Sequence, residues 1–307
     1  MIDKIIKRIR LVGSDSRWWG FFLQRQFMAP RSRRWLAARV AQRKPMAPDG
    51  GSDADVASAC KELGESGITM LGELVGPEAC TELRTYFSQR EVHDPYRPGT
   101  PHFLPDGTER HPDAHIAHHS AADVVRAPYL LALANSPKIL AIVGKFLGCK
   151  PTIGYLAVWW SYQTDKGAQQ AEHFHRDVDD WRIVKLFIYL TDVGPQSGPH
   201  IFVQHSSNSP SLTKIRRFSD EEVVDAFGVA NVLTMTAAAG QGFLEDTFGI
   251  HKGQPVESGT RLIFQAVYSM NALPYGPQQV VIDLNSVQST DPGQRFDPWV
   301  NRVYVGG

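Results

Sequence analysis

The run PTIGYLAVWWSY (residues 151–162) is the first of several short stretches rich in β-branched and aromatic residues. Gly, Pro and Ser separate it from five similar runs at 183–193, 199–205, 240–246, 260–270 and 278–285. Short apolar runs bounded by turn residues are typical of strands in a β-sandwich or barrel. We therefore predict an antiparallel β core over residues 149–290.

Helical patterns come before this β region. Asp53 or Asp55 can cap a helix that ends near Gly64, and a short strand is expected within residues 66–75. Gly76-Pro77-Glu78 starts a second helix, since proline is tolerated in the first helical turn. Apolar residues then recur at helical spacing over residues 128–147. The predicted class is α+β, with a helical layer (54–148) packed on a mainly β core.

The first 48 residues form a basic, aromatic-rich arm. They hold 12 of the 32 Lys and Arg residues but only two of the 32 acidic residues, which leaves 20 basic and 30 acidic residues in the rest of the chain. The linker-like APDGGSD (47–53) separates this arm from a domain at 54–307. The arm contains the aromatic residues Trp18, Trp19, Phe21, Phe22, Phe27 and Trp35. Two helices packed on the body would explain this composition, as would contact with an anionic membrane surface or an acidic partner.

Overall composition excludes several classes of protein. The 307 residues carry no formal net charge, which argues against nucleic-acid binding by the chain as a whole. Cys60, Cys80 and Cys149 are widely spaced without a CxxC pair, so we expect free thiols in a reducing compartment. No apolar run reaches the roughly 20 residues that span a bilayer, and no secretory pattern opens the chain. A cytoplasmic protein is expected, with the arm as a means of peripheral membrane contact.

The stretch AEHFHRDVDDW (171–181) carries the densest group of metal-ligand side chains. If it is an extended strand, alternate side chains point to the same face. His173, His175, Asp177 and Asp179 would then share one face. Four ligands exceed what a small site with room for substrate needs, so the strand pattern alone leaves the choice among them open.

A histidine and a carboxylate two residues apart form part of a 2-His-1-carboxylate site, which suits Fe(II) and leaves coordination positions open. His175 and Asp177 have this spacing. The candidates for the second histidine are His200, His205 and His251. His251 lies just before a predicted strand that carries Arg261, whose planar, always-charged fork can bind a carboxylate.

Three segments resemble the phytanoyl-CoA dioxygenase family of Fe(II)/2-oxoglutarate-dependent oxygenases. They are HFHRD (173–177), KLFIYLTDVGPQSGPHIFV (185–203) and GIHKGQPVESGTRLIFQ (249–265). GITMLGELVGPEACTELRTYF (67–87) and LALANSPKILAIVGKFLG (131–148) are similar to the N-terminal half of that family. The likeness covers roughly residues 54–290 and implies a double-stranded β-helix (jelly-roll, cupin-like) core.

The resemblance also implies an activity and a site. His175, Asp177 and His251 would bind Fe(II), and Arg261 would pair with the distal carboxylate of 2-oxoglutarate. The enzyme would hydroxylate a small-molecule or conjugated biosynthetic intermediate while 2-oxoglutarate and O2 become succinate and CO2. Asp177, where related halogenases have Gly or Ala, argues against halogenation.

Further residues are candidates for lining this site. Lys185 and Tyr189 share one face of a predicted strand, and either could contact 2-oxoglutarate; a lysine inside an apolar strand is rarely buried without a partner. His200 and Trp181 are either site-lining or core residues. The sequence VQHSSNS (203–209) stands where family members often have PGSH, so we assign His205 no role.

Two alternatives differ from an oxygenase. Gly167, His173, His175 and Asp179 resemble the first cupin motif, in which four ligands bind the metal, although the rest of that motif is missing here. A non-catalytic jelly-roll binding protein, recruited by its basic arm, is also compatible with the fold alone. The set of three ligands with Arg261 argues against such a protein.

Two loops are expected to shape the substrate pocket, at residues 92–120 and 204–220. The first is rich in Pro, Gly, Asp and His. Its histidines are His102, His111, His115, His118 and His119. No carboxylate or cysteine stands at a persuasive ligand spacing from them, so a solvated or substrate-lining loop is expected in preference to a second metal site.

Overall fold

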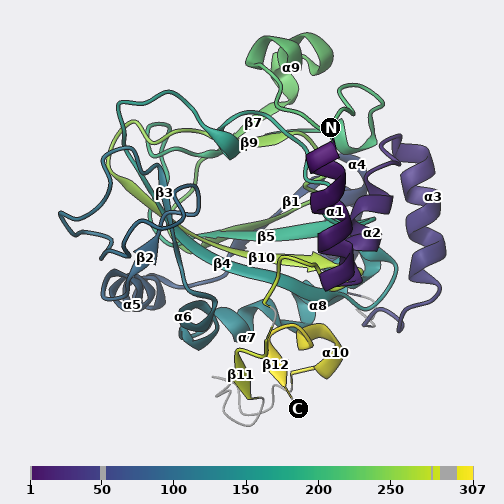
Figure 1. The fold of residues 1–307 in the computed structure, drawn as a ribbon, viewed down its shortest axis with the longest axis horizontal. Coiled ribbons are helices and arrows are strands. Elements are labelled where there is room, and N and C mark those ends of the chain that lie inside the picture. The colour runs from purple at the N-terminus through teal and green to yellow at the C-terminus, as the bar shows by residue number, and fades with distance from the viewer. Residues whose placement is uncertain (1, 49–52, 278, 284–295, 307) are drawn as a thin grey trace.

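A computed structural model of the chain describes residues 2–48, 53–277, 279–283 and 296–306. Two β-sheets face each other, and helices cover the outer face of the larger one (Figure 1). The three cysteines are free thiols, as predicted.

The larger sheet has seven strands, and every pairing in it is antiparallel. Their spatial order is β1 (Ile68–Glu73), β8 (Gln241–Glu245), β5 (Ile183–Tyr189), β10 (Thr260–Ser269), β4 (Thr152–Tyr162), β3 (Ile116–His119) and β2 (Val92–His93). Strands distant in sequence are neighbours in this order, as in a jelly roll. The predicted run at 151–162 is β4, in the interior of the sheet.

The smaller sheet has the order β7 (Val232–Met235), β6 (His200–Val203), β9 (His251–Gly253). Phe187, Tyr189 and Phe243 of the large sheet pack against Phe202 and Met235 of the small one. A cavity adjoins this apolar cluster, since Phe187 and Ile263 belong to the cluster and also line the cavity. The predicted jelly-roll core is confirmed.

One predicted core strand is placed differently. The run 278–285 lies partly outside the described residues, and within it β11 (Ile282–Asp283) pairs in parallel with β12 (Val305–Gly306) in a separate two-stranded sheet. A short helix, α10 (Pro298–Asn301), precedes β12. The pattern rightly indicated extended backbone but not its partner, because pairing depends on where the chain end returns.

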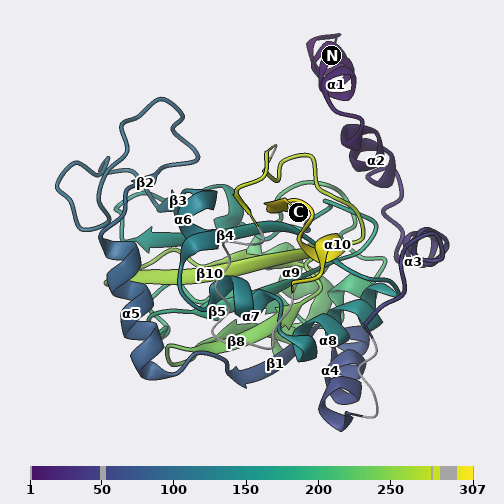
Figure 2. The ribbon, with the colours of Figure 1, turned by 90° about the horizontal axis from the view of Figure 1, so that it is seen from below.

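The helices on the outer face are α4 (Ala54–Glu65), α5 (Pro77–Ser88), α6 (Ala121–Arg126), α7 (Leu130–Ala134) and α8 (Pro137–Leu147) (Figure 2). The single helix expected over 128–147 is divided at Asn135 and Ser136, because the residue before a proline disfavours helical backbone. Leu130–Leu147 is long and apolar enough to cross a membrane by composition, but 67% of it is buried inside the protein.

The arm forms α1 (Ile2–Ser14), α2 (Arg17–Gln24) and α3 (Pro30–Ala41). Helices α2 and α3 lie at one side of the body, and α1 extends away from it (Figure 2). The inner side of the arm packs on the body: the rings of Phe27 and Trp181 lie 5.7 Å apart. Its outer side leaves Trp19 68% and Trp35 60% exposed. Contact of this outer side with an anionic surface stays a prediction, which co-sedimentation with anionic and neutral vesicles tests.

The remaining helix, α9 (Asp220–Phe227), lies above the small sheet (Figure 1). Ser219 caps it by accepting a hydrogen bond from the amide of Glu222, whose side chain accepts one from the amide of Ser219 in return. Short 3-10 turns occupy Gln170–Glu172, Ser206–Asn208 and Val229–Asn231.

Candidate metal centre and cofactor cavity

The segment 171–181 is extended but is not a regular strand. Among the described residues its β-type pairing consists of two isolated bridges, Phe174 to Phe218 and His175 to His251, and the chain bends after Val178. His175, Asp177 and Asp179 line one cavity, whereas His173 is exposed and does not line it. The expectation that all four side chains share one strand face is therefore wrong for His173, because the segment is bridged at Phe174 and His175 and is not a continuous strand.

Three side chains bring their ligand atoms together at the inner end of this cavity. Nε2 of His175 lies 3.6 Å from Oδ1 of Asp177, and Nε2 of His251 lies 3.2 Å from Oδ2. All three ligand atoms fall within 4.8 Å of one another. Reciprocal backbone hydrogen bonds of 2.9 and 3.0 Å join His175 to His251, so the two imidazoles are fixed side by side.

The hydrogen bonds of both imidazoles orient them for a metal. Nδ1 of His175 donates to the carbonyl of His173 at 2.9 Å, and Nδ1 of His251 donates to that of Gly249 at 3.0 Å. With Nδ1 protonated in each ring, each Nε2 presents a lone pair to the shared site. Burial, helped by the neighbouring His251, lowers the pKa of His175 to about 3, so it is a neutral ligand. The donor set fits a divalent metal.

Lys185 orients the carboxylate of this group. Its Nζ donates to Oδ2 of Asp177 at 2.6 Å. Burial disfavours the charged form of Asp177, but Lys185 and His251 outweigh it and hold the pKa of Asp177 well below its usual range. Lys185 lines the cavity, yet its ammonium group is committed to Asp177. If Lys185 also contacts 2-oxoglutarate, as predicted, its ammonium group has to serve Asp177 and the cosubstrate together.

Tyr189 lies behind the cavity wall. Its hydroxyl donates to the carbonyl of Met235 at 2.8 Å and accepts from the amide of His200 at 3.0 Å. These bonds tie β5 to both β6 and β7. Tyr189 is fully buried and is not among the residues lining the cavity, so nothing in this geometry supports the predicted contact with 2-oxoglutarate.

A buried carboxyl that sequence reasoning missed lies behind His251. Oε2 of Glu245 is 2.7 Å from Nε2 of His200, and Oε1 is 3.7 Å from Nδ1 of His251. Burial raises the pKa of Glu245 to about 8 and lowers that of His200 to about 3, so a neutral carboxyl donates to a neutral imidazole. The sequence did contain a sign of this buried carboxyl. Glu245 lies inside the apolar run 240–246, just as Lys185 lies inside the apolar run 183–193.

Arg261 lies in the wall of the same cavity. Only 5% of it is exposed; its Nη2 donates to Oγ of Ser161 at 2.9 Å, and its Nε has no hydrogen-bond partner within the described residues. Gly253 lies beside it, and both residues line the cavity. A buried, partly unsatisfied guanidinium with open space beside it is suited to a carboxylate ligand.

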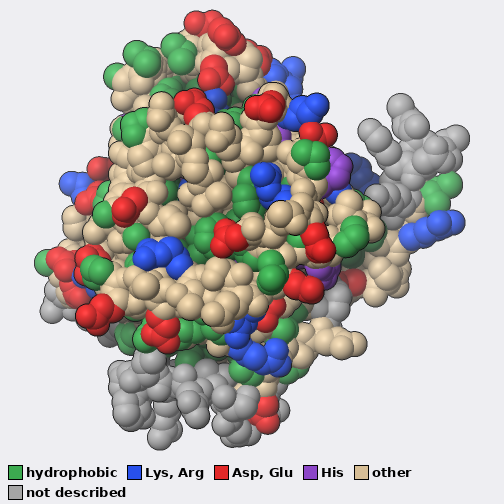
Figure 3. Space-filling view, turned by 90° about the vertical axis from the view of Figure 1, so that its left-hand side faces the viewer, with side chains coloured by type: hydrophobic (Ala, Val, Ile, Leu, Met, Phe, Trp, Pro, Cys, Tyr) green, Lys and Arg blue, Asp and Glu red, His purple; other side chains and the backbone are tan. Residues whose placement is uncertain are grey.

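The cavity has a volume of about 530 Å³ and joins the three metal-ligand side chains to Arg261. Both predicted pocket loops contribute to its wall, through Tyr96 and His118 from one and Arg217 from the other. Trp159 stacks on His118 with ring centroids 5.4 Å apart. On the molecular face drawn in Figure 3, acidic and basic side chains are interspersed, so no single charge dominates it.

Within the ranges that the structure describes, the group of potential metal ligands is His175, Asp177 and His251, and it includes none of the histidines of residues 92–120. His115 bonds to Glu172 at 2.7 Å and to Thr164 at 2.9 Å. The prediction of a substrate-lining loop is consistent with these positions.

Burial of His118 and His119 should make the folded protein less stable in acid. Burial lowers the pKa of each to about 4, while near His119 Asp123 and Arg90 act in opposite directions. Because the folded-state pKa lies below the unfolded value, stability is lost as the pH falls from about 6.5 towards 4. Each histidine is expected to lower the free energy of unfolding by roughly 2 kcal/mol when the pH falls from 7 to 5.

His119→Phe keeps an aromatic ring on Phe87, which lies 4.6 Å from the histidine ring, and removes one titrating group. Urea unfolding at pH 7 and 5 should show a pH-dependent loss smaller than that of the wild type by roughly 2 kcal/mol. An identical loss in both proteins would contradict the predicted role of burial.

The comparisons with known proteins concern the fold. No family model matches the sequence, and no curated protein matches it. Among solved structures, EctD from S. alaskensis, with 2-oxoglutarate and 5-hydroxyectoine, is 17% identical, with a TM-score of 0.52 over 86% of this chain and 93% of its own. SnoN, a non-haem α-ketoglutarate-dependent epimerase from nogalamycin biosynthesis, is 16% identical, with a TM-score of 0.51 over 70% and 82%.

The chain has the fold of the non-haem 2-oxoglutarate-dependent enzymes. This is the fold that the resemblance to the phytanoyl-CoA dioxygenase family implied. The cupin alternative requires four ligands, and His173 is absent from the group that the structure brings together. The group that the structure brings together thus has three members, one fewer than the cupin motif needs.

Proposed function

We propose that this protein is a non-haem Fe(II)- and 2-oxoglutarate-dependent oxygenase that acts on a small-molecule or conjugated biosynthetic intermediate. One observation carries the proposal: the ligand atoms of His175, Asp177 and His251 converge in the same cavity whose wall holds Arg261. A 2-His-1-carboxylate set with room beside it suits Fe(II) and leaves positions for other ligands. A scaffold protein would need neither the ligand set nor a buried guanidinium beside open space.

Each residue has a distinct task in this proposal. Bound Fe(II) supplies the redox centre at which O2 and 2-oxoglutarate are converted to succinate and CO2. The backbone carbonyls at His173 and Gly249 hold both imidazoles with Nε2 towards the metal site. Lys185 holds the carboxylate of Asp177 in its ionised form. Arg261 binds the distal carboxylate of 2-oxoglutarate and so sets its orientation.

Hydroxylation is the proposed outcome for the substrate. SnoN shares the fold and is an epimerase, so the fold is compatible with more than one reaction. Asp177 supports oxygen transfer over halogenation, because it fills the position that the related halogenases leave to chloride. A gain of one oxygen atom by the product distinguishes hydroxylation from epimerisation, which leaves the mass unchanged.

The cavity favours a substrate with a negative charge. Arg25 and Arg217 both line it, and neither has an ion-pair partner within 4.0 Å among the residues that the structure describes. By contrast, Arg216 at the same wall is paired with Glu222, and Lys185 with Asp177. Asp179 lines the same cavity and acts on the charge of Arg25, so we infer that an anionic group of the substrate, such as a carboxylate or phosphate, neutralises Arg217.

Succinate release tests the proposal. The protein is incubated with Fe(II), 2-oxoglutarate and O2, with and without a panel of anionic metabolites. Fe(II)-dependent succinate should appear slowly without substrate and about tenfold or more faster with a true substrate. The product should then gain one oxygen by mass. Absence of any Fe(II)-dependent succinate would overturn the proposal.

A further inference from the structure

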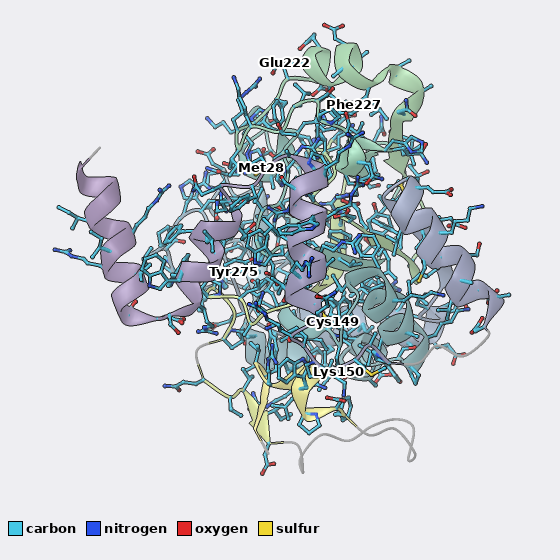
Figure 4. All side chains as sticks on the ribbon, turned by 90° about the vertical axis from the view of Figure 1, so that its right-hand side faces the viewer. Met28, Cys149, Lys150, Glu222, Phe227 and Tyr275 are labelled. Carbon is cyan, nitrogen blue, oxygen red and sulfur yellow. The ribbon has the colours of Figure 1, made fainter. Side chains whose placement is uncertain are left out.

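The end of helix α2 in the arm reaches the segment that carries Asp177. Gln24 is fully buried although the arm lies at the edge of the protein, and its Nε2 donates to the carbonyl of Val178 at 2.7 Å. Val178 directly follows Asp177. Figure 4 shows Met28 and Tyr275 on this side of the molecule, where the ring of Phe21 meets that of Tyr275 at 6.1 Å.

Two further arm residues complete the contact. Nη1 of Arg25 donates to the same carbonyl of Val178 at 3.0 Å. Arg33 joins the arm to the segment, because it donates to the carbonyl of Gln24 at 3.0 Å and also hydrogen-bonds the carbonyl of Asp180. Thus the carbonyls on both sides of Asp179 receive their hydrogen bonds from the arm.

The segment needs such partners because the sheets do not provide them. After the bridge at His175, the amide of Asp177 donates to the carbonyl of Thr247 at 2.8 Å, and no strand follows until β5. Val178 and Asp180 are nonetheless buried. A buried carbonyl without a hydrogen bond is costly, so loss of the arm contacts would shift the segment towards water.

We propose that residues 17–41 act as a strap in which Gln24 is a positioning residue for the metal ligand Asp177. The inference rests on the proposed function, since it assumes that Asp177 binds a metal. Ligands must be held closely in place to bind well, and removal of the groups that orient them typically weakens metal binding about 10- to 100-fold. The strap also brings Arg25 into the cavity wall, so it contributes to the substrate end of the site.

Gln24→Met tests the strap in the full-length protein, because methionine keeps the length of the side chain but neither donates to Val178 nor accepts the hydrogen bond from Arg33. The matched control is Gln26→Met: Gln26 is exposed, and its side chain bonds only within the arm, to the carbonyl of Phe22. Co(II) affinity is measured by titration, and amide hydrogen exchange over residues 176–181 by mass spectrometry. We expect Gln24→Met to bind Co(II) about tenfold more weakly and to exchange faster in this segment. Gln26→Met should match the wild type in both.

The outcomes separate three explanations. Unchanged Co(II) affinity and exchange in Gln24→Met, even with a lower Tm, would show a merely structural role and overturn the inference. Failure of the wild type to bind Co(II) would instead refute the proposed function. If Gln24→Met does not fold, Arg25→Met, which removes the second donor to Val178 together with the charge of Arg25, is compared with the wild type by hydrogen exchange over residues 176–181: faster exchange supports the strap, and unchanged exchange rejects it.

Discussion

His175→Ala is expected to abolish metal binding and succinate formation, whereas His173→Ala, two residues earlier, is expected to preserve both. The buried imidazole of His175 lies 3.6 Å from Asp177, and its Nδ1–H is fixed by a backbone carbonyl. The side chain of His173 is exposed, and its contribution is that carbonyl, which alanine retains. Removing one of three ligands should lower Fe(II) affinity by at least about 100-fold, more than loss of an outer partner would.

Isothermal titration measures the Co(II) affinity of both variants, and the succinate assay measures their turnover. Equal losses in His173→Ala and His175→Ala would favour the four-ligand cupin site over the three-ligand site. Retained turnover in His175→Ala would remove this histidine from the metal centre altogether. Either result would require a new assignment of the ligands.

Arg261→Met should raise the KM for 2-oxoglutarate by about 100-fold with a smaller change in kcat. A charge-assisted hydrogen bond to a buried partner contributes about 1.5–3 kcal/mol, and Arg261 can offer two. The effect should fall mainly on KM because the distal carboxylate is bound equally before and during reaction. Methionine fills much of the same volume, so the jelly roll should remain intact.

Arg261→Lys provides the comparison within this experiment. Lysine restores the positive charge but not the planar fork, so its KM should lie between those of the wild type and Arg261→Met. Steady-state kinetics with varied 2-oxoglutarate measures all three. A KM in Arg261→Met equal to that of the wild type would show that the cosubstrate binds elsewhere.

Local pattern was sufficient to predict most of the core strands and the three side chains that the structure brings together in this cavity. Apolar runs bounded by Gly and Pro became β4, β5 and β10, because residues with strong strand preference can bury both faces between a helical layer and a second sheet. The spacing from His175 to Asp177, and from His251 to Arg261, lies within short segments. Residues so close in the chain stay close in space in any fold, so their arrangement can be read from the sequence.

Contacts between distant segments were not predictable in the same way. Gln24 and Val178 are separated by 154 positions, and the Pro- and Gly-rich stretch at 47–53 suggested an arm separate from the site. Likewise, the neighbouring sequence does not show that the hydroxyl of Tyr189 donates to the carbonyl of Met235, or that Glu245 lies behind His251. Polar residues in apolar runs signal a buried partner, but the fold alone supplies its identity.

Anaerobic addition of 2-oxoglutarate to the Fe(II)-loaded protein tests the central claim most directly. If His175, Asp177 and His251 hold Fe(II) and leave positions for the keto-acid end of 2-oxoglutarate, a visible charge-transfer band should grow to saturation at one equivalent per chain. The band should be absent in His175→Ala, which removes one of the two imidazole ligands. A wild-type protein that binds Fe(II) but shows no band at saturating 2-oxoglutarate would contradict the account.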